Sequence, residues 1–115
     1  MDETHPSNKR FLELLDEMRA LSARKQADYG RSADPFANVR ASEDFGIPGW
    51  VGSVMRMNDK MRRLQTASRK TLRKTVNDQG NTVVMLDNEP ITDSLIDIAV
   101  YALISLVLYE EETDV

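Results

Sequence analysis

The sequence has no cysteine, and its one histidine, His5, stands near the N-terminus. Without cysteine, disulfide bonds and thiolate metal sites are excluded. A single histidine argues against a histidine-ligated zinc site and against a Ser-His-Asp triad. The chain also lacks a glycine-rich phosphate loop of the Walker type and a GxGxxG dinucleotide fingerprint. Any chemistry must therefore come from Asp, Glu, Lys, Arg, Tyr and Asn side chains.

Length and charge set further limits. The 115 residues are enough for one domain with a modest core. The net charge of −4 argues against a dedicated duplex-binding protein. The polar N-terminus shows no signal peptide. We therefore expect a soluble, cytoplasmic protein that forms one domain over residues 1–115, with frayed ends at 1–7 and 110–115.

The most apolar stretch of the chain, residues 92–108, predicts a helix that is buried on most of its circumference. From Leu95 to Leu108, only Asp97, Tyr101 and Ser105 carry polar side-chain groups. We predict that this helix is too short and too charged to span a membrane, which takes about 20 mostly apolar residues.

Two carboxylates lie on this apolar helix. Asp93 and Asp97 are one turn apart and share a face, and Tyr101 continues the stripe. A carboxylate on a buried helix is costly unless it is paired or binds a metal. Two interpretations stay open. Either Asp93 favours the helix dipole while Asp97 pairs with an arginine, or the two acids bind a divalent metal.

Two further long helices are predicted, over residues 8–27 and 50–69, from apolar side chains at a 3.6-residue period. On the first, Glu13 and Glu17 are one turn apart and form either a solvated flank with Lys and Arg partners or a pair of metal ligands. On the second, an apolar stripe comprises Val54, Met57, Met61 and Leu64, and a polar stripe comprises Arg56, Asp59, Lys60 and Arg63. Spacing alone places the polar stripe opposite the apolar one, as a solvated face of ion pairs would be.

The connecting segments carry weaker signals. Residues 36–45 predict a short helix within a loop-like stretch. Two β-prone runs around the polar turn 77–80 predict a small hairpin near residues 72–86. Before the hairpin stands a basic cluster that is either a solvated face or a nucleic-acid contact, formed by Arg69, Lys70, Arg73 and Lys74.

Acids and cations therefore accompany each other on helical segments, a combination that fits a Mg²⁺-bound phosphate ester or anhydride. The metal bridges phosphate oxygens and activates water, while Arg or Lys neutralises the remaining charge. Mg²⁺ prefers a few carboxylates, waters and substrate phosphates to a closed protein cage. The residues themselves thus indicate nucleotide hydrolysis.

Four local patterns, taken in order, resemble a known family. They are Lys25-x-x-Asp28-Tyr29-Gly30, Asp34-Pro35-Phe36-x-Asn38, Gly52-x-x-x-Arg56-Met57-x-Asp59-Lys60-x-x-Arg63-Leu64, and Ile91-x-Asp93-x-Leu95-x-Asp97-Ile98-Ala99-x-Tyr101. Their order and spacing resemble the phage and bacterial nucleotide modification associated domain 1 family. They also resemble the small MazG-like nucleotide pyrophosphohydrolases of phages. The resemblance covers about residues 11–108.

This resemblance implies an all-α helical bundle of the all-alpha NTP pyrophosphohydrolase (MazG-like) type, assembled as a homo-oligomer, a dimer or tetramer. It implies that a nucleoside triphosphate is cleaved between the α- and β-phosphates, giving a monophosphate and pyrophosphate. The cofactor would be Mg²⁺, with Mn²⁺ as a substitute. The phage resemblance favours purine deoxynucleotides, dGTP first, and a host-cytoplasmic location if the chain is phage-encoded.

The resemblance also implies roles for individual residues. The implied catalytic residues are Asp59, Lys60 and Asp97. The implied metal ligands are Asp59, Asp93, Asp97, Glu13 and Glu17. The implied substrate contacts are Lys25, Asp28, Tyr29, Asn38, Arg56, Arg63 and Tyr101.

The acid pattern departs from that of the MazG-like proteins, which carry ExxE on one helix and ExxD on the next. Here Glu13 is followed by Asp16 and Glu17, Asp59 has no preceding partner acid, and the last motif is DxxxD. Two alternatives to the enzyme therefore stay open. One is a non-catalytic nucleotide-binding or regulatory module, and the other is a helical adaptor that binds nucleic acid through its basic cluster.

Overall fold

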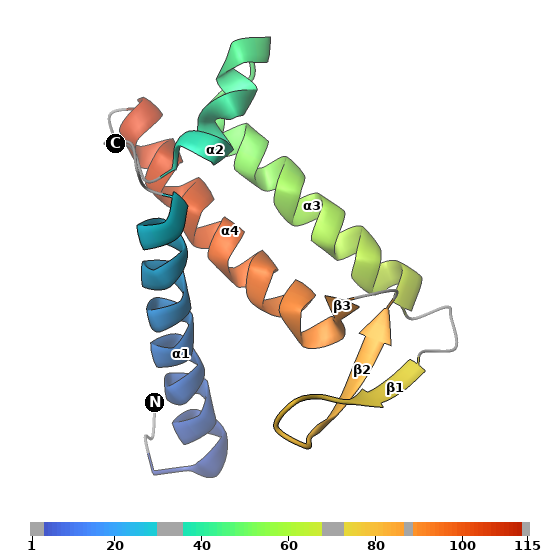
Figure 1. Cartoon of the computed structure of the whole chain (residues 1–115). Helices are drawn as coiled ribbons and strands as arrows, with labels where there is room; N and C mark the ends of the chain where they lie inside the picture. The colour runs from blue at the N-terminus through green and yellow to red at the C-terminus, as the bar shows by residue number, and fades with distance from the viewer. Residues whose placement is uncertain (1–3, 30–35, 68–72, 87–88, 114–115) are drawn as a thin grey trace. The chain divides into compact units, whose positions relative to one another are not determined.

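The backbone is mainly helical, with one small antiparallel sheet (Figure 1). This computed structural model describes residues 4–29, 36–67, 73–86 and 89–113. The chain forms two compact units, Met1–Ala37 and Asn38–Val115. The mainly helical class and the hairpin are confirmed, and a single domain over the whole chain stays a prediction.

In the first unit the structure describes one long helix, α1 (Pro6–Tyr29), which extends two residues beyond the predicted 8–27 at each end. Pro6 suits the first helical turn, where its missing N–H would have no partner. The His5 ring contributes a cap, because Nδ1 accepts a hydrogen bond from the Ser7 backbone N–H at 3.1 Å. On the predicted apolar stripe, Phe11 and Leu15 are exposed.

The second unit is a pair of long helices joined through a small sheet. Its elements are α2 (Ala37–Arg40), the 3₁₀ helix η1 (Ala41–Phe45), α3 (Gly49–Ala67), β1 (Arg73–Val76), β2 (Thr82–Leu86), β3 (Glu89–Pro90) and α4 (Ile91–Thr113). The strand order is β1-β2-β3 with antiparallel neighbours. The predicted helix over 36–45 is thus split into an α-helical turn and a 3₁₀ turn.

The β1–β2 hairpin closes through the polar turn that the sequence predicted. The Asn77 carboxamide oxygen accepts hydrogen bonds from the backbone N–H groups of Gln79 and Asn81, at 3.1 and 2.9 Å. Gly80 has φ +81°, a left-handed conformation that glycine adopts without steric cost. The turn chemistry therefore fixes the register that pairs Val76 with Thr82.

Small residues line the contact between α3 and α4. Gly49 and Ser53 are buried on α3, and Ser94 and Ser105 are buried on α4. Because these side chains are short, the two backbones approach each other. The approach is close enough for the Ser53 hydroxyl to donate a hydrogen bond to the Tyr101 backbone carbonyl on the other helix, at 3.1 Å. The predicted apolar stripe of Val54, Met57, Met61 and Leu64 is only half-buried, and Met61 is exposed.

Gly52 has no room for a side chain. A methyl group at this position would lie 2.7 Å from the Ser42 Cβ of η1. We expect Gly52→Ala to lower the free energy of unfolding by about 1–3 kcal/mol through overpacking, although alanine alone favours a helix by about 1 kcal/mol over glycine.

A double-mutant cycle in urea, followed by circular dichroism, checks this expectation. Ser42→Gly removes the obstructing atoms, so Gly52→Ala should cost much less in that background than in the natural chain. Stabilisation by Gly52→Ala alone would show that η1 does not press on α3.

The helix α4 is longer and less covered than the sequence predicted. It has 23 residues and continues through the acidic segment that was expected to fray, as far as Thr113. Its apolar side chains are also more exposed than expected: Leu95, Leu103 and Leu106 each keep more than half of their surface accessible. A strongly apolar composition shows which surface should be covered, but not that this chain covers it.

The length of α4 matters for the prediction that this helix does not span a membrane. By length and composition alone it is long and apolar enough to cross a membrane, a test that core helices of soluble proteins also pass. The prediction that the segment is too short therefore does not hold. The prediction that the helix is too charged to span a membrane depends on Asp93 and Asp97, which stand in its first two turns.

The acidic end of α4 is tied to the start of α3. The Glu112 carboxylate accepts hydrogen bonds from the backbone N–H groups of Gly49 and Trp50, at 2.8 and 3.1 Å. These amides have no partner within their own helix, and a carboxylate at a helix N-terminus also favours the helix dipole. Arg40 adds an ion pair with Glu111. These contacts explain why the helix continues where charge alone predicted fraying.

Candidate functional site

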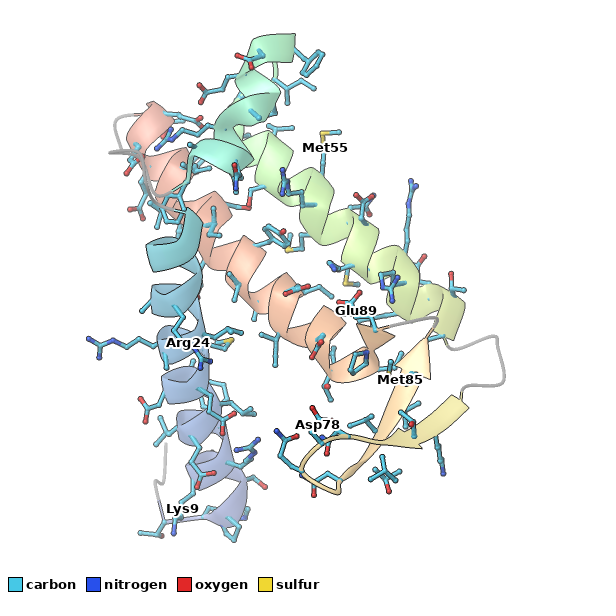
Figure 2. The ribbon with its side chains drawn as sticks, viewed as in Figure 1. Lys9, Arg24, Met55, Asp78, Met85 and Glu89 are labelled. Carbon is cyan, nitrogen blue, oxygen red and sulfur yellow. The ribbon has the colours of Figure 1, made fainter. Side chains whose placement is uncertain are left out.

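Four charged side chains meet where β3 leads into α4, opposite the second half of α3. The Lys60 Nζ lies 3.0 Å from Asp97 Oδ2 and 3.3 Å from Glu89 Oε1. The Arg63 Nη2 lies 3.2 Å from Glu89 Oε2. Figure 2 labels Glu89, which stands on the short strand beside both helices. We call these four residues the charge cluster.

The charge cluster is half-buried rather than solvated. Between 23% and 29% of each side chain remains accessible. The hydrogen bond that the Lys60 ammonium donates to the Asp97 carboxylate is the main cause that raises the pKa of Lys60, against the opposing effect of burial. The formal charges of two cations and two carboxylates cancel, so the cluster has no net formal charge.

Helical geometry explains how the sequence builds this cluster. Lys60 lies one turn beyond Met57 and two turns beyond Ser53, so it belongs to the side of α3 that faces α4. Arg63 is a further turn along, and its Nε lies 3.4 Å from the buried Ser94 hydroxyl. The predicted polar stripe is therefore divided, since Lys60 and Arg63 contact α4 and β3 while Arg56 and Asp59 are exposed.

Three other predicted substrate contacts lie elsewhere in the second unit. The Arg56 guanidinium donates a hydrogen bond to the Asn38 backbone carbonyl at 3.2 Å, which brings two of them together near the start of α2. Tyr101 is half-buried on α4. Its backbone carbonyl accepts hydrogen bonds from Ser53 and Ser105, at 3.1 and 2.7 Å.

Comparison with known proteins does not place the chain. No family model, no curated protein and no solved structure matches it. The assignment of roles therefore depends on the residues and their geometry.

The predicted metal ligands do not all converge. Among the described residues, no three acidic or histidine side chains form a group that could hold a metal ion. Asp59 is exposed on α3, and Asp93 is exposed in the first turn of α4. Asp97 is the predicted ligand that the structure places in the charge cluster.

Glu13 and Glu17 have a partner of their own on α1. The Arg10 guanidinium lies 3.2 Å from Glu13 and 3.0 Å from Glu17. All three side chains are exposed, and the two carboxylates raise the pKa of Arg10, Glu17 most strongly. This arrangement agrees with the interpretation of a solvated flank.

Several predicted residues fall outside what the structure describes. Lys25, Asp28 and Tyr29 lie in the last turns of α1, but their side chains are not among the described ones. Gly30 and residues 34–35 of the motifs, and Arg69 and Lys70 of the basic cluster, also lie outside. The predictions on these residues stay predictions.

The sequence did not single out Glu89 or Ser94. Glu89 belongs to a two-residue strand, which shows no periodicity, and its place beside Lys60 depends on how the hairpin redirects the chain. Ser94 follows Asp93 and reads as an ordinary first-turn residue. Only an indirect signal for Glu89 was available in the sequence. Lys60 and Arg63 stand three residues apart on one helix, and two half-buried cations need carboxylates as partners.

Proposed function

We propose that the protein is a Mg²⁺-dependent (deoxy)nucleoside triphosphate pyrophosphohydrolase of the MazG-like type. It would convert a dNTP and water to a dNMP and pyrophosphate. The observation that carries the proposal is the Lys60–Asp97 pair, in which a predicted catalytic cation and a predicted metal ligand from separate motifs lie 3.0 Å apart. The motif resemblance supplies the reaction class.

Asp97 and Asp93 would hold a magnesium ion whose remaining ligands are waters and substrate oxygens. Asp97 is half-buried and keeps access to solvent, and Asp93 precedes it by one turn of the same helix. One or two carboxylates, completed by waters and phosphate oxygens, are the usual protein contribution to Mg²⁺ binding. When bound, Mg²⁺ would polarise the phosphate oxygens and make water a better nucleophile.

The side chains of the protein would then have separate roles in the reaction. Lys60 and Arg63 would neutralise phosphate oxygens, where charge builds up as the α–β anhydride bond breaks. Asp97 would accept a proton from the attacking water. Arg56, in the middle of α3, donates a hydrogen bond to the Asn38 backbone carbonyl, and we propose that Arg56 contacts the phosphates and Asn38 the nucleoside part of the substrate.

We also propose a homo-oligomer in the cytoplasm. The support is the exposed apolar surface of α4, because large exposed apolar patches on a small protein mark surfaces that another molecule covers. A second copy would cover this surface in the predicted dimer or tetramer.

Pyrophosphate release tests the proposed reaction. The eight common NTPs and dNTPs are incubated with the full chain, once with Mg²⁺ and once with EDTA. We expect release from one or two purine deoxynucleotides, dGTP first, and none with EDTA. Absence of release from all eight would contradict the proposal, and nucleotide-dependent thermal stabilisation in that case would identify a non-catalytic binding module.

A further inference from the structure

The carboxylate of Glu89 is held in a way that a phosphate group could imitate. One of its oxygens, Oε1, lies 3.3 Å from the Lys60 ammonium, and the other, Oε2, lies 3.2 Å from the Arg63 guanidinium. A phosphate group offers the same arrangement, since it presents several oxygens to neighbouring cationic donors.

From this geometry we infer that Lys60 and Arg63 form a phosphate-binding pair, and that the Glu89 carboxylate occupies this pair when no phosphate is bound. Glu89 is then an internal competitor of the anionic ligand. The inference rests on the proposed function, which identifies the anion as a phosphate group of a nucleotide. It adds that Glu89 regulates the binding of this phosphate group.

The position of Glu89 in the chain suits such a role. It stands on β3, a strand of only two residues that pairs with the edge of a hairpin, whereas Lys60, Arg63 and Asp97 stand on long helices. A side chain on a short connecting strand can be displaced without unfolding a helix. The remaining exposure of 28% also leaves Glu89 within reach of a solute.

Electrostatics sets the expected direction. With Glu89 ionised, the charge cluster is neutral, so an incoming anion must displace one carboxylate and meets the repulsion of another. With Glu89 neutralised, the same cluster carries a net charge of about +1, and an anion is attracted. Lys60 keeps its partner Asp97 in both cases.

The test is isothermal titration calorimetry of the full chain with inorganic pyrophosphate, in EDTA and at low salt. We expect Glu89→Gln to bind pyrophosphate about five- to tenfold more tightly than the natural chain, as the loss of one nearby like charge predicts. Glu111→Gln is the matched control, because it removes the same charge from another arginine-paired glutamate. It should change the affinity by less than about twofold.

Two further variants complete the test. Lys60→Met with Arg63→Gln should abolish the binding that Glu89→Gln improves. Glu89→Asp withdraws the carboxylate by one methylene and should give an affinity between the natural chain and Glu89→Gln; it replaces Glu89→Gln if circular dichroism shows that variant unfolded.

Unchanged or weaker pyrophosphate binding by Glu89→Gln, or by Glu89→Asp in its place, would overturn the inference. Weaker binding would show instead that Glu89 positions the two cations. Because the titration contains EDTA and measures no turnover, its outcome is separate from the pyrophosphate-release assay. A protein that hydrolyses nothing can still show the predicted gain, and an active enzyme can fail to show it.

Discussion

Replacement of Asp97 by asparagine is expected to lower Mg²⁺-dependent pyrophosphate release by about 10²–10⁴-fold, the range that the loss of a proton-accepting group costs. The substitution keeps the size of the side chain and removes its charge. Asparagine would therefore neither accept the proton of the attacking water nor attract a divalent cation as a carboxylate does.

The fold should tolerate Asp97→Asn. Lys60 retains Glu89 as a partner at 3.3 Å, and an ion pair with about a quarter of its surface exposed contributes on the order of 1 kcal/mol or less. Helical circular dichroism and the urea midpoint should stay close to those of the natural chain. Glu111→Gln, with the same change of charge, should keep full activity. If Asp97→Asn also remains active, the acidic stripe of α4 is structural.

Replacement of Leu108 by alanine is expected to lower the free energy of unfolding by about 2–5 kcal/mol. Leu108 is completely buried, and with Val39 it makes up the buried hydrophobic side chains of the described structure. Alanine would leave a cavity that the surrounding structure fills only in part. A domain of this size is stable by only about 5–15 kcal/mol, so the loss is a large fraction.

Urea denaturation of Leu108→Ala, followed by circular dichroism, measures this effect. Leu103→Ala is the matched control, because the same methyl groups are removed from the same helix at a site that is 57% exposed. Its cost should stay within about 0.5 kcal/mol, as for most surface substitutions, when both variants are measured at a protein concentration too low for the proposed homo-oligomer to form. Equal losses in the two variants would contradict the difference in burial, and would show that another surface covers α4 in solution.

The long helices and the hairpin could be predicted because their signals are local. A 3.6-residue period of apolar side chains, or a polar turn between β-prone runs, is contained within the segment that it describes. The ends were less predictable. The acidic end of α4 reads as a frayed tail until Glu112 is seen to accept two backbone hydrogen bonds from α3, a contact between distant parts of the chain.

The candidate site was predictable in part for the same reason. Lys60 and Asp97 each belong to a helical stripe, so the sequence could nominate them, and the structure brings them together. Spacing alone could not decide which members of the α3 polar stripe turn inward, because that depends on where α4 packs. The role of Glu89 could not be predicted from the sequence, because its position follows from the path of the hairpin and not from a periodic pattern of side chains.

The contact between Glu112 and the start of α3 also has a meaning for the order of folding. The Gly49 and Trp50 amides are separated from the carboxylate that caps them by 63 and 62 residues. During synthesis, the chain would extend through the whole of α3, the hairpin and almost all of α4 before that partner exists. Closing so long a loop delays the contact and makes it depend on the helices having already paired. The second unit should therefore complete its folding in a single late step, in which the last turn of α4 is among the last parts to become ordered.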